Sequence, residues 1–152
     1  MTEIYHWFNG KLFTDVSEDA RDYYPSMFTA VDFCRQHYVE EGQEPISTAE
    51  AVSKLISSGF IMVLGETWVG WFDTAEPWFV PDVYLCEELF GPRPGKTVDL
   101  QDFINAGEAL AKKKGCRYFE FGTRANPKPQ ALARMCRQFG VKQAALTLQK
   151  EI

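Results

Sequence analysis

The stretch from residue 82 to residue 121 constrains the fold more than any other part of the chain. Residues 82–90 (DVYLCEELF) are rich in strand-forming side chains. Residues 91–97 (GPRPGKT) carry two prolines and two glycines, which exclude a helix or a central strand and predict a loop. Asp99 then caps a helix, and residues 116–121 (CRYFEF) predict another strand. A strand, a helix and a strand joined in this way form a crossover, which makes the two strands parallel neighbours in one sheet.

The remaining residues predict further helices and antiparallel strands around that crossover. A capping box at residues 47–50 (STAE) starts one helix, and residues 26–41 carry apolar side chains at helical spacing. Two strand-forming segments, 60–64 and 68–72, are split by Gly-Glu-Thr and predict a hairpin. Further predictions are a strand or hairpin at 3–14, a helical turn or loop at 15–22, a helix over 129–139 closed by Gly140, and a final strand at 141–148. We therefore expect a mixed α/β chain with a central, mixed and mostly antiparallel sheet flanked by helices.

Charge is divided unevenly along the chain. Residues 1–92 hold four basic and 16 acidic side chains, a net charge of −12, whereas residues 93–152 hold 12 basic and five acidic, a net charge of +7. Such an asymmetry indicates that different partners meet different ends of the molecule.

Composition excludes several classes of protein. With 45% hydrophobic and 24% charged residues, the 152-residue chain is not disordered. No apolar run approaches the roughly 20 residues of a membrane span, and the first ten residues do not form a secretory signal, so we expect a cytoplasmic protein without a membrane partner. Four cysteines and two histidines lack metal-site spacing, which predicts reduced thiols and no metal site.

Residues 82–148 resemble the GCN5-related N-acetyltransferases, the GNAT family. The points of similarity are the strand VYLCEELF, the loop GPRPGKT that opens a helix, and the helix end ALAKKKGCRYFEFG. Asn126 then precedes a helix whose last turn, residues 136–141 (CRQFGV), is similar to the family's Tyr-x-x-x-Gly-Phe. The resemblance implies a GNAT-like acyl-CoA N-acyltransferase fold over residues 1–152, with 1–81 as the acceptor-side half and 82–152 as the CoA-binding half.

That resemblance implies acetyl-CoA, or another acyl-CoA, bound along the loop. The implied cofactor-binding residues are Leu89, Phe90, Gly91, Arg93, Pro94, Gly95, Lys96, Thr97 and Asn126. A loop that enters a helix N-terminus presents unpaired amides and the positive end of the helix dipole, which suits a pyrophosphate. Asn126 would hydrogen-bond the pantetheine arm, and the alternative is an ordinary turn residue before Pro127.

The implied catalytic residues are Glu87, Glu88 and Cys136. In the family, a carboxylate removes a proton, often through water, from the attacking ammonium, while amides corresponding to those near residues 89–91 polarise the thioester carbonyl. Because side chains alternate across a strand, we expect only one of the two glutamates to face the cleft. The alternative is that both are solvated or ion-paired. Cys136 stands where the family's proton-donating tyrosine occurs, and the alternative for it is a packed helix cysteine.

The chain also departs from the family, which keeps a second class of function open. Lys96 and Val98 occupy positions where the family's loop has glycines, and departures of this kind are familiar among phage-encoded versions of the fold. The resemblance implies transfer of an acetyl group from acetyl-CoA to an amine by direct attack. The alternative is a catalytically degenerate GNAT-fold protein that binds or assembles with a partner.

Three further interpretations carry less weight. Gly-Lys-Thr at residues 95–97 is similar to a nucleotide P-loop, but the required first glycine falls on Phe90. Nucleic-acid binding by the basic half is not expected in a mainly acidic protein. The aromatic-rich segment 68–79 indicates either core packing or a recognition surface.

The expected partner is an amine acceptor, either a small molecule or a protein. The acidic residues of the first half would attract a cationic amine such as a lysine, a polyamine or a basic protein. A homodimer is an open alternative for the oligomeric state.

Overall fold

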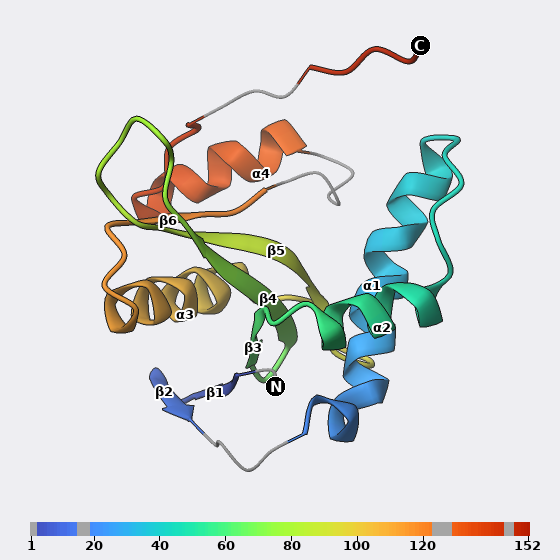
Figure 1. Ribbon diagram of the computed structural model, residues 1–152, viewed down its shortest axis with the longest axis horizontal. Coiled ribbons are helices and arrows are strands. Elements are labelled where there is room, and N and C mark those ends of the chain that lie inside the picture. Colours follow the sequence, from blue (N-terminus) through green and yellow to red (C-terminus); the bar gives the residue numbers. More distant parts are fainter. Residues whose placement is uncertain (1–2, 15–18, 123–128, 145–147) are drawn as a thin grey trace.

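A single sheet of six strands runs through the parts of the chain that the computed structural model describes, which are residues 3–14, 19–122, 129–144 and 148–152. The strand order is β2-β1-β3-β4-β5-β6 (Figure 1). The β1–β2, β3–β4 and β4–β5 pairs are antiparallel, and the β1–β3 and β5–β6 pairs are parallel. The strands are β1 (Ile4–Phe8), β2 (Lys11–Thr14), β3 (Ile61–Leu64), β4 (Trp68–Ala75), β5 (Tyr84–Pro92) and β6 (Tyr118–Glu120). The predicted mixed sheet and its parallel crossover are therefore confirmed.

Helices cover both faces of this sheet, and each pair buries a separate hydrophobic cluster. On one face, α1 and α2 pack with Met62 and Trp71. On the other, α3 and α4 pack with Phe72 and Leu85. The helices are α1 (Tyr24–Glu40), α2 (Thr48–Ser57), α3 (Leu100–Lys113) and α4 (Pro129–Cys136), with short 3-10 turns at Ala20–Tyr23 and Arg137–Phe139. Burial of both faces explains why β3 is apolar throughout instead of alternating.

The helix boundaries agree with the caps predicted from the sequence. Ser47 accepts a hydrogen bond from the Glu50 amide at 3.1 Å, and Asp99 accepts one from the Asp102 amide at 3.1 Å. Gly140 adopts a left-handed conformation (φ 77°) after the turn that follows α4. These local signals located three of the helix ends correctly.

β5 extends further than predicted, which corrects the assignment of Gly91 and Pro92 to a loop. Gly91 pairs with Val69 and Pro92 with Trp68. The next amide, of Arg93, donates to the Thr67 carbonyl at 3.1 Å, so the Pro92 nitrogen points away from β4. β6 pairs only with residues 84–86, so this nitrogen faces an unpaired edge, where a missing donor costs no ladder hydrogen bond.

The predicted final strand at 141–148 is wrong for the residues that the structure describes. Residues 141–144 and 148 belong to no strand, and residues 145–147 lie outside the described part. The Val141 amide instead donates to the Cys136 carbonyl at 3.3 Å and completes the end of the preceding helix. Leu148 is 85% exposed. The strand-like sequence pattern of residues 141–144 therefore forms no strand in this structure.

Gly91 sets how closely α1 approaches β5. A Cβ atom at this position would lie 2.8 Å from the Ala30 carbonyl oxygen and 2.9 Å from the Ala30 Cα. Because these are backbone atoms, we expect Gly91→Ala to displace α1 and lower the free energy of unfolding by about 2 kcal/mol in urea titrations. Gly122→Ala is the control, since its added Cβ would meet nothing within 4 Å in the described part of the chain beyond its own chain neighbours. Equal stability of the two variants would contradict this close approach.

Candidate active site

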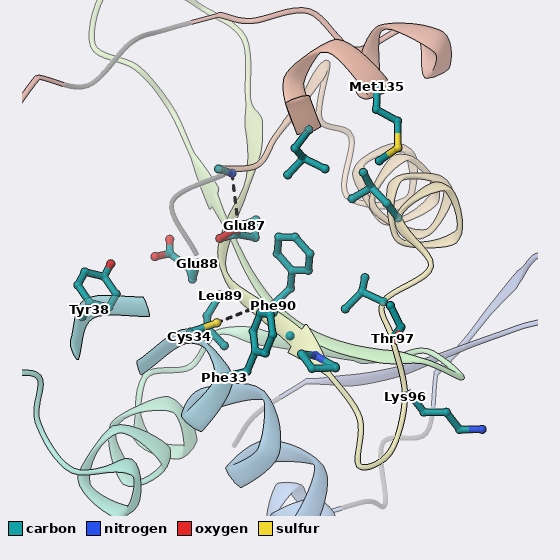
Figure 2. Close-up of a pocket in the computed structure, with 16 residues that line it drawn as sticks. Phe33, Cys34, Tyr38, Glu87, Glu88, Leu89, Phe90, Lys96, Thr97 and Met135 are labelled. Carbon is teal, nitrogen blue, oxygen red and sulfur yellow. Dashed lines mark hydrogen bonds between the residues drawn. The ribbon is translucent and has the colours of Figure 1, made fainter. Parts of the chain in front are cut away.

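β5 and β6 pair over three residues each and then diverge. A cavity lies along the part of the β5 edge that β6 leaves unpaired. Its volume is about 540 Å³. The wall is formed by α1, the second half of β5, the segment that leads into α3, and α4 (Figure 2). The wall includes the polar side chains of Cys34, Tyr38, Glu87, Glu88 and Lys96, together with Phe90. The remaining wall is mainly apolar and includes Phe33, Leu132 and Met135.

The unpaired edge presents backbone hydrogen-bonding groups to this cavity. Residues 91 and 93 direct their amides toward β4, so the alternation of an antiparallel strand turns the N–H and C=O of Phe90 toward the free edge. The Cys34 thiol donates to this Phe90 carbonyl at 3.2 Å (Figure 2). A strand edge of this kind can pair with an extended ligand that carries amide groups.

Both glutamates predicted as candidates line the cavity, which corrects the expectation that only one would. Trp71 pairs with Leu89 and Phe72 pairs with Glu87, so Glu88 is an extra residue in a β-bulge. The bulge breaks the strict alternation of side chains. The Glu87 carboxylate accepts from the Gly122 amide, and Glu88 points toward the side where Tyr38 lies (Figure 2).

Glu87 is the strongly perturbed carboxyl group of the site. Burial raises the pKa of Glu87 to about 7, and the neighbouring Glu88 adds to the rise. The Gly122 amide opposes this by donating to Glu87 Oε1 at 3.4 Å. Burial also raises the pKa of Glu88, with a contribution from Asp73. A carboxyl group that titrates near neutral pH can both accept and release a proton under physiological conditions.

The cysteines of this region are not poised to act as nucleophiles. Burial and the Glu87 carboxylate raise the pKa of Cys34 to about 12, so it stays protonated as a hydrogen-bond donor. Cys136 is 2% exposed within the cluster under α3 and is not among the cavity-lining residues. Burial raises its pKa. The structure therefore does not bring Cys136 to the two glutamates.

Of the two basic residues of the loop, Lys96 lines the cavity and Arg93 does not, and the exposed Lys96 side chain extends away from Glu87 and Phe90 (Figure 2). Lys96 and Thr97 line the cavity, together with Leu89, Phe90 and Gly91 from β5. The Arg93 guanidinium instead donates to the Gly65 carbonyl at 2.8 Å. Arg93, Pro94 and Gly95 are not among the lining residues, and Asn126 lies outside the described part of the chain.

The N-terminus of α3 already carries an anion of its own. The Asp99 carboxylate caps the helix, and the Asp99 amide donates to Thr67 Oγ1 at 3.0 Å. Asp102, in the first turn, accepts hydrogen bonds from the indoles of Trp7 and Trp68 at 2.8 and 3.0 Å. Two carboxylates thus offset part of the positive potential of this helix end.

The described residues hold neither a metal-binding cluster nor a membrane-spanning helix. These residues contain no group of three or more His, Cys, Asp or Glu side chains that could hold a metal ion. None of their helices is both long and apolar enough to cross a bilayer.

Several wall residues were missed by reasoning from the sequence. Phe33, Cys34 and Tyr38 lie on α1, and Leu132 and Met135 lie on α4. The one signal in the sequence was an aromatic residue, Phe33, outside the apolar stripe of its helix, and the structure leaves it 50% exposed. The other residues follow no chemical motif, because they are brought to the cavity by the packing of distant helices.

Comparison with known proteins identifies the fold. No family model matches the chain, and no curated protein sequence matches it significantly. A tetramutant of the BH1408 protein from Bacillus halodurans has a similar structure, with a TM-score of 0.61 and 9% identity over 89% of this chain and 97% of that chain. A second mutant of BH1408, with a single substitution, gives a TM-score of 0.59 and 8% identity over 89% of this chain and 96% of that one.

A third solved structure is that of an enzyme. The aminoglycoside acetyltransferase HMB0005, from an uncultured soil metagenomic sample, gives a TM-score of 0.51 and 12% identity over 83% of this chain and 90% of that chain. At such identities the likeness establishes the fold alone. The chain therefore has the mixed α/β, GNAT-like fold that its sequence resembles.

Proposed function

We propose that the protein is an acyl-CoA-dependent N-acyltransferase that moves an acetyl group to an amine. One observation carries the proposal: a half-buried glutamate, Glu87, with a pKa of about 7 lies in the cavity where β5 and β6 diverge. The likeness in fold to an acetyltransferase supports it. A general base that titrates near pH 7 is suited to removing a proton from an amine without binding it permanently.

Glu87, Glu88 and the backbone of Phe90 have separate roles in the proposed reaction. An acyl-CoA, when bound, supplies the thioester whose carbonyl carbon the amine attacks and whose thiol departs. Glu87 accepts a proton from the incoming ammonium, directly or through water, and later releases it to solvent. The Phe90 N–H on the free edge of β5 is the backbone donor available to stabilise negative charge on the carbonyl oxygen. Glu88 raises the basicity of Glu87 through its own charge.

The site also offers contacts for the pantetheine part of CoA. The Phe90 C=O would accept a hydrogen bond from a pantetheine amide while the Phe90 N–H serves the thioester carbonyl, and the walls formed by Leu132 and Met135 would contact the apolar carbons. The Cys34 thiol already donates a hydrogen bond to the Phe90 carbonyl, and an amide of such a ligand would replace the thiol as donor. Lys96 is the lining cation that could meet a phosphate.

The simplest test of the proposal is a thermal-shift titration with acetyl-CoA. Binding to the native state must raise the unfolding temperature, by an amount that grows with ligand concentration. Absence of stabilisation at millimolar acetyl-CoA, in a sample shown to be folded, would reject the proposal.

Asp99 provides a prediction about the phosphate end. Asp99→Asn keeps a side-chain cap on α3 and removes a negative charge from the helix end, so we expect CoA to bind about two to five times more tightly. Isothermal titration calorimetry at low salt measures this, and raising the salt should reduce the gain. Pantetheine is the control ligand. Because it carries no phosphate, its affinity should be the same for Asp99→Asn and for the unaltered protein. Unchanged or weaker CoA binding would place the phosphates away from this helix end.

A further inference from the structure

No described helix covers one part of the sheet next to the candidate site. This part consists of Asp73 on β4, Tyr84, Cys86 and Glu88 on β5, and Tyr118 and Glu120 on β6, which we call the open face. Strand register puts these side chains, apart from Glu88, on the sheet face that α1 and α2 cover elsewhere, because Cys86 pairs with both Asp73 and Glu120 and Tyr84 pairs with Tyr118. Glu88, the bulge residue, lies near them, since its charge raises the pKa of Cys86 and the charge of Asp73 raises the pKa of Glu88. Figure 1 shows α1 and α2 beside the other end of β5, away from β6.

The open face is accessible and negatively charged. Asp73, Glu88 and Glu120 are all exposed, and the three strands contain no lysine or arginine. The three carboxylates lie close enough together to affect one group, the Cys86 thiol. Burial raises the pKa of Cys86, and the charges of Glu120, Glu88 and Asp73 raise it further. The Asp73 carboxylate makes only a local hydrogen bond, to the Thr74 amide at 2.9 Å, among the contacts described for it.

Aromatic rings lie among these carboxylates. The rings of Tyr84 and Tyr118 are 4.8 Å apart, and Tyr118 is 42% exposed. The Arg117 guanidinium lies 5.6 Å from the Tyr118 ring centroid and pairs with Asp82 at 3.6 Å. The tyrosine pair thus already stacks with one cation from the edge of the face, and its exposed remainder can stack with another.

The open face leads directly to the proposed base. Glu88 belongs both to this face and to the cavity wall, and Glu87 directly precedes it on β5. From Tyr84 to Glu88 the strand spans about 13 Å, at roughly 3.3 Å per residue. Of the residues of the open face, only Glu88 lines the cavity, so the face offers little enclosure to a small polyamine, but an extended peptide can place alternate side chains on successive carboxylates.

We propose that the open face docks an extended basic peptide segment of a protein acceptor, and directs a lysine ammonium from it past Glu88 to Glu87. The direction of the lysine toward Glu87 rests on the proposed acyltransferase function, whereas docking of the basic segment does not. Charge complementarity selects the peptide, and the tyrosine pair favours arginine or lysine side chains over neutral ones.

Fluorescence anisotropy with a labelled decapeptide of alternating lysine and alanine tests the docking without requiring activity. We expect Asp73→Asn combined with Glu120→Gln to weaken peptide binding about fivefold at low salt. The matched control combines Glu66→Gln with Glu108→Gln, two exposed carboxylates outside the open face that give the same change in net charge. The control pair should bind the peptide as the unaltered protein does.

The outcomes separate the two proposals. If acetyl-CoA fails to bind but the two pairs of variants differ as expected, the docking stands and the acyltransferase function fails. If acyl transfer is observed but both pairs bind the peptide equally, or the peptide does not bind, the docking is overturned. Spermidine that binds as tightly as the decapeptide, with the same dependence on Asp73 and Glu120, would overturn the assignment of a peptide.

Discussion

Replacing Glu87 by glutamine is expected to lower acyl transfer at least about 100-fold and, at the same time, to make the protein more stable at pH 8. Glutamine keeps the shape of the side chain and an oxygen that can accept from the Gly122 amide, but it cannot take a proton from an amine. In the unaltered protein we expect the rate to rise with pH and to level off above about pH 7, where Glu87 is ionised. Steady-state kinetics across this range measure both effects.

Glu87→Gln is expected to raise stability although it lowers the rate. The reason is that folding raises the pKa of Glu87 from 4.5 to about 7. Between these two values the native state holds a proton that the unfolded chain has lost, so stability falls as pH rises through the window. Glutamine avoids that loss, which amounts to about 3 kcal/mol above pH 7. Urea titrations at pH 8 and pH 4 should therefore show a large gain at the higher pH and almost none at the lower.

Two further variants make the Glu87 result specific. Glu88→Gln should have a smaller effect on both rate and stability, because Glu88 is more exposed and acts through Glu87. Glu108→Gln, on the exposed side of α3, should change neither. If Glu88→Gln abolished the activity while Glu87→Gln retained it, Glu88 would be the base. A Glu87→Gln variant with unchanged stability at both pH values would contradict the raised pKa.

Asp102→Ala is expected to destabilise the protein by about 3 kcal/mol, which for a chain of this size lowers Tm by roughly 6 to 12 °C. Its carboxylate joins three elements, because it lies on α3 and accepts from Trp7 on β1 and from Trp68 on β4. Trp68 is fully buried and Trp7 is 6% exposed. Removing the acceptor leaves two buried indole N–H groups without a partner, and each then loses its hydrogen bond without regaining one to bulk water.

A double-mutant cycle identifies the cause of that loss. Trp7→Phe removes one of the two donors, so it should cost less in the Asp102→Ala background than in the unaltered protein. Glu108→Ala controls for the loss of a negative charge from the same helix. Equal costs of Trp7→Phe in both backgrounds would show that Asp102 stabilises the fold through the helix dipole instead.

Those features that depend on neighbouring residues in the chain could be predicted from the sequence. Ser47 and Asp99 cap their helices as expected, and Gly140 ends the last turn in a left-handed conformation. The crossover from β5 through α3 to β6 follows from the alternation of strand and helix signals with a loop that excludes both. Each of these is fixed by side chains within a few residues of the feature.

Features that depend on pairing between distant segments could not be predicted in the same way. The bulge at Glu88 exists because β4 and β5 shift register opposite Trp71 and Phe72, and nothing in residues 84–92 alone encodes it. The free edge of β5 likewise depends on β6 being only three residues long. Consequently the sequence identified both glutamates as candidates but assigned them to opposite faces, whereas the bulge lets both line the cavity.

Hydrogen exchange in the presence and absence of acetyl-CoA tests most directly whether an acyl-CoA binds along the free edge of β5, as we propose. We expect saturable protection of amides in residues 87–100, with Phe90 among them, because the ligand would pair with that edge and reach the N-terminus of α3. The amides of α2, on the far side of the sheet from α3, should exchange unchanged. Absence of protection at saturating acetyl-CoA, or protection confined to segments other than residues 87–100, would contradict this mode of binding.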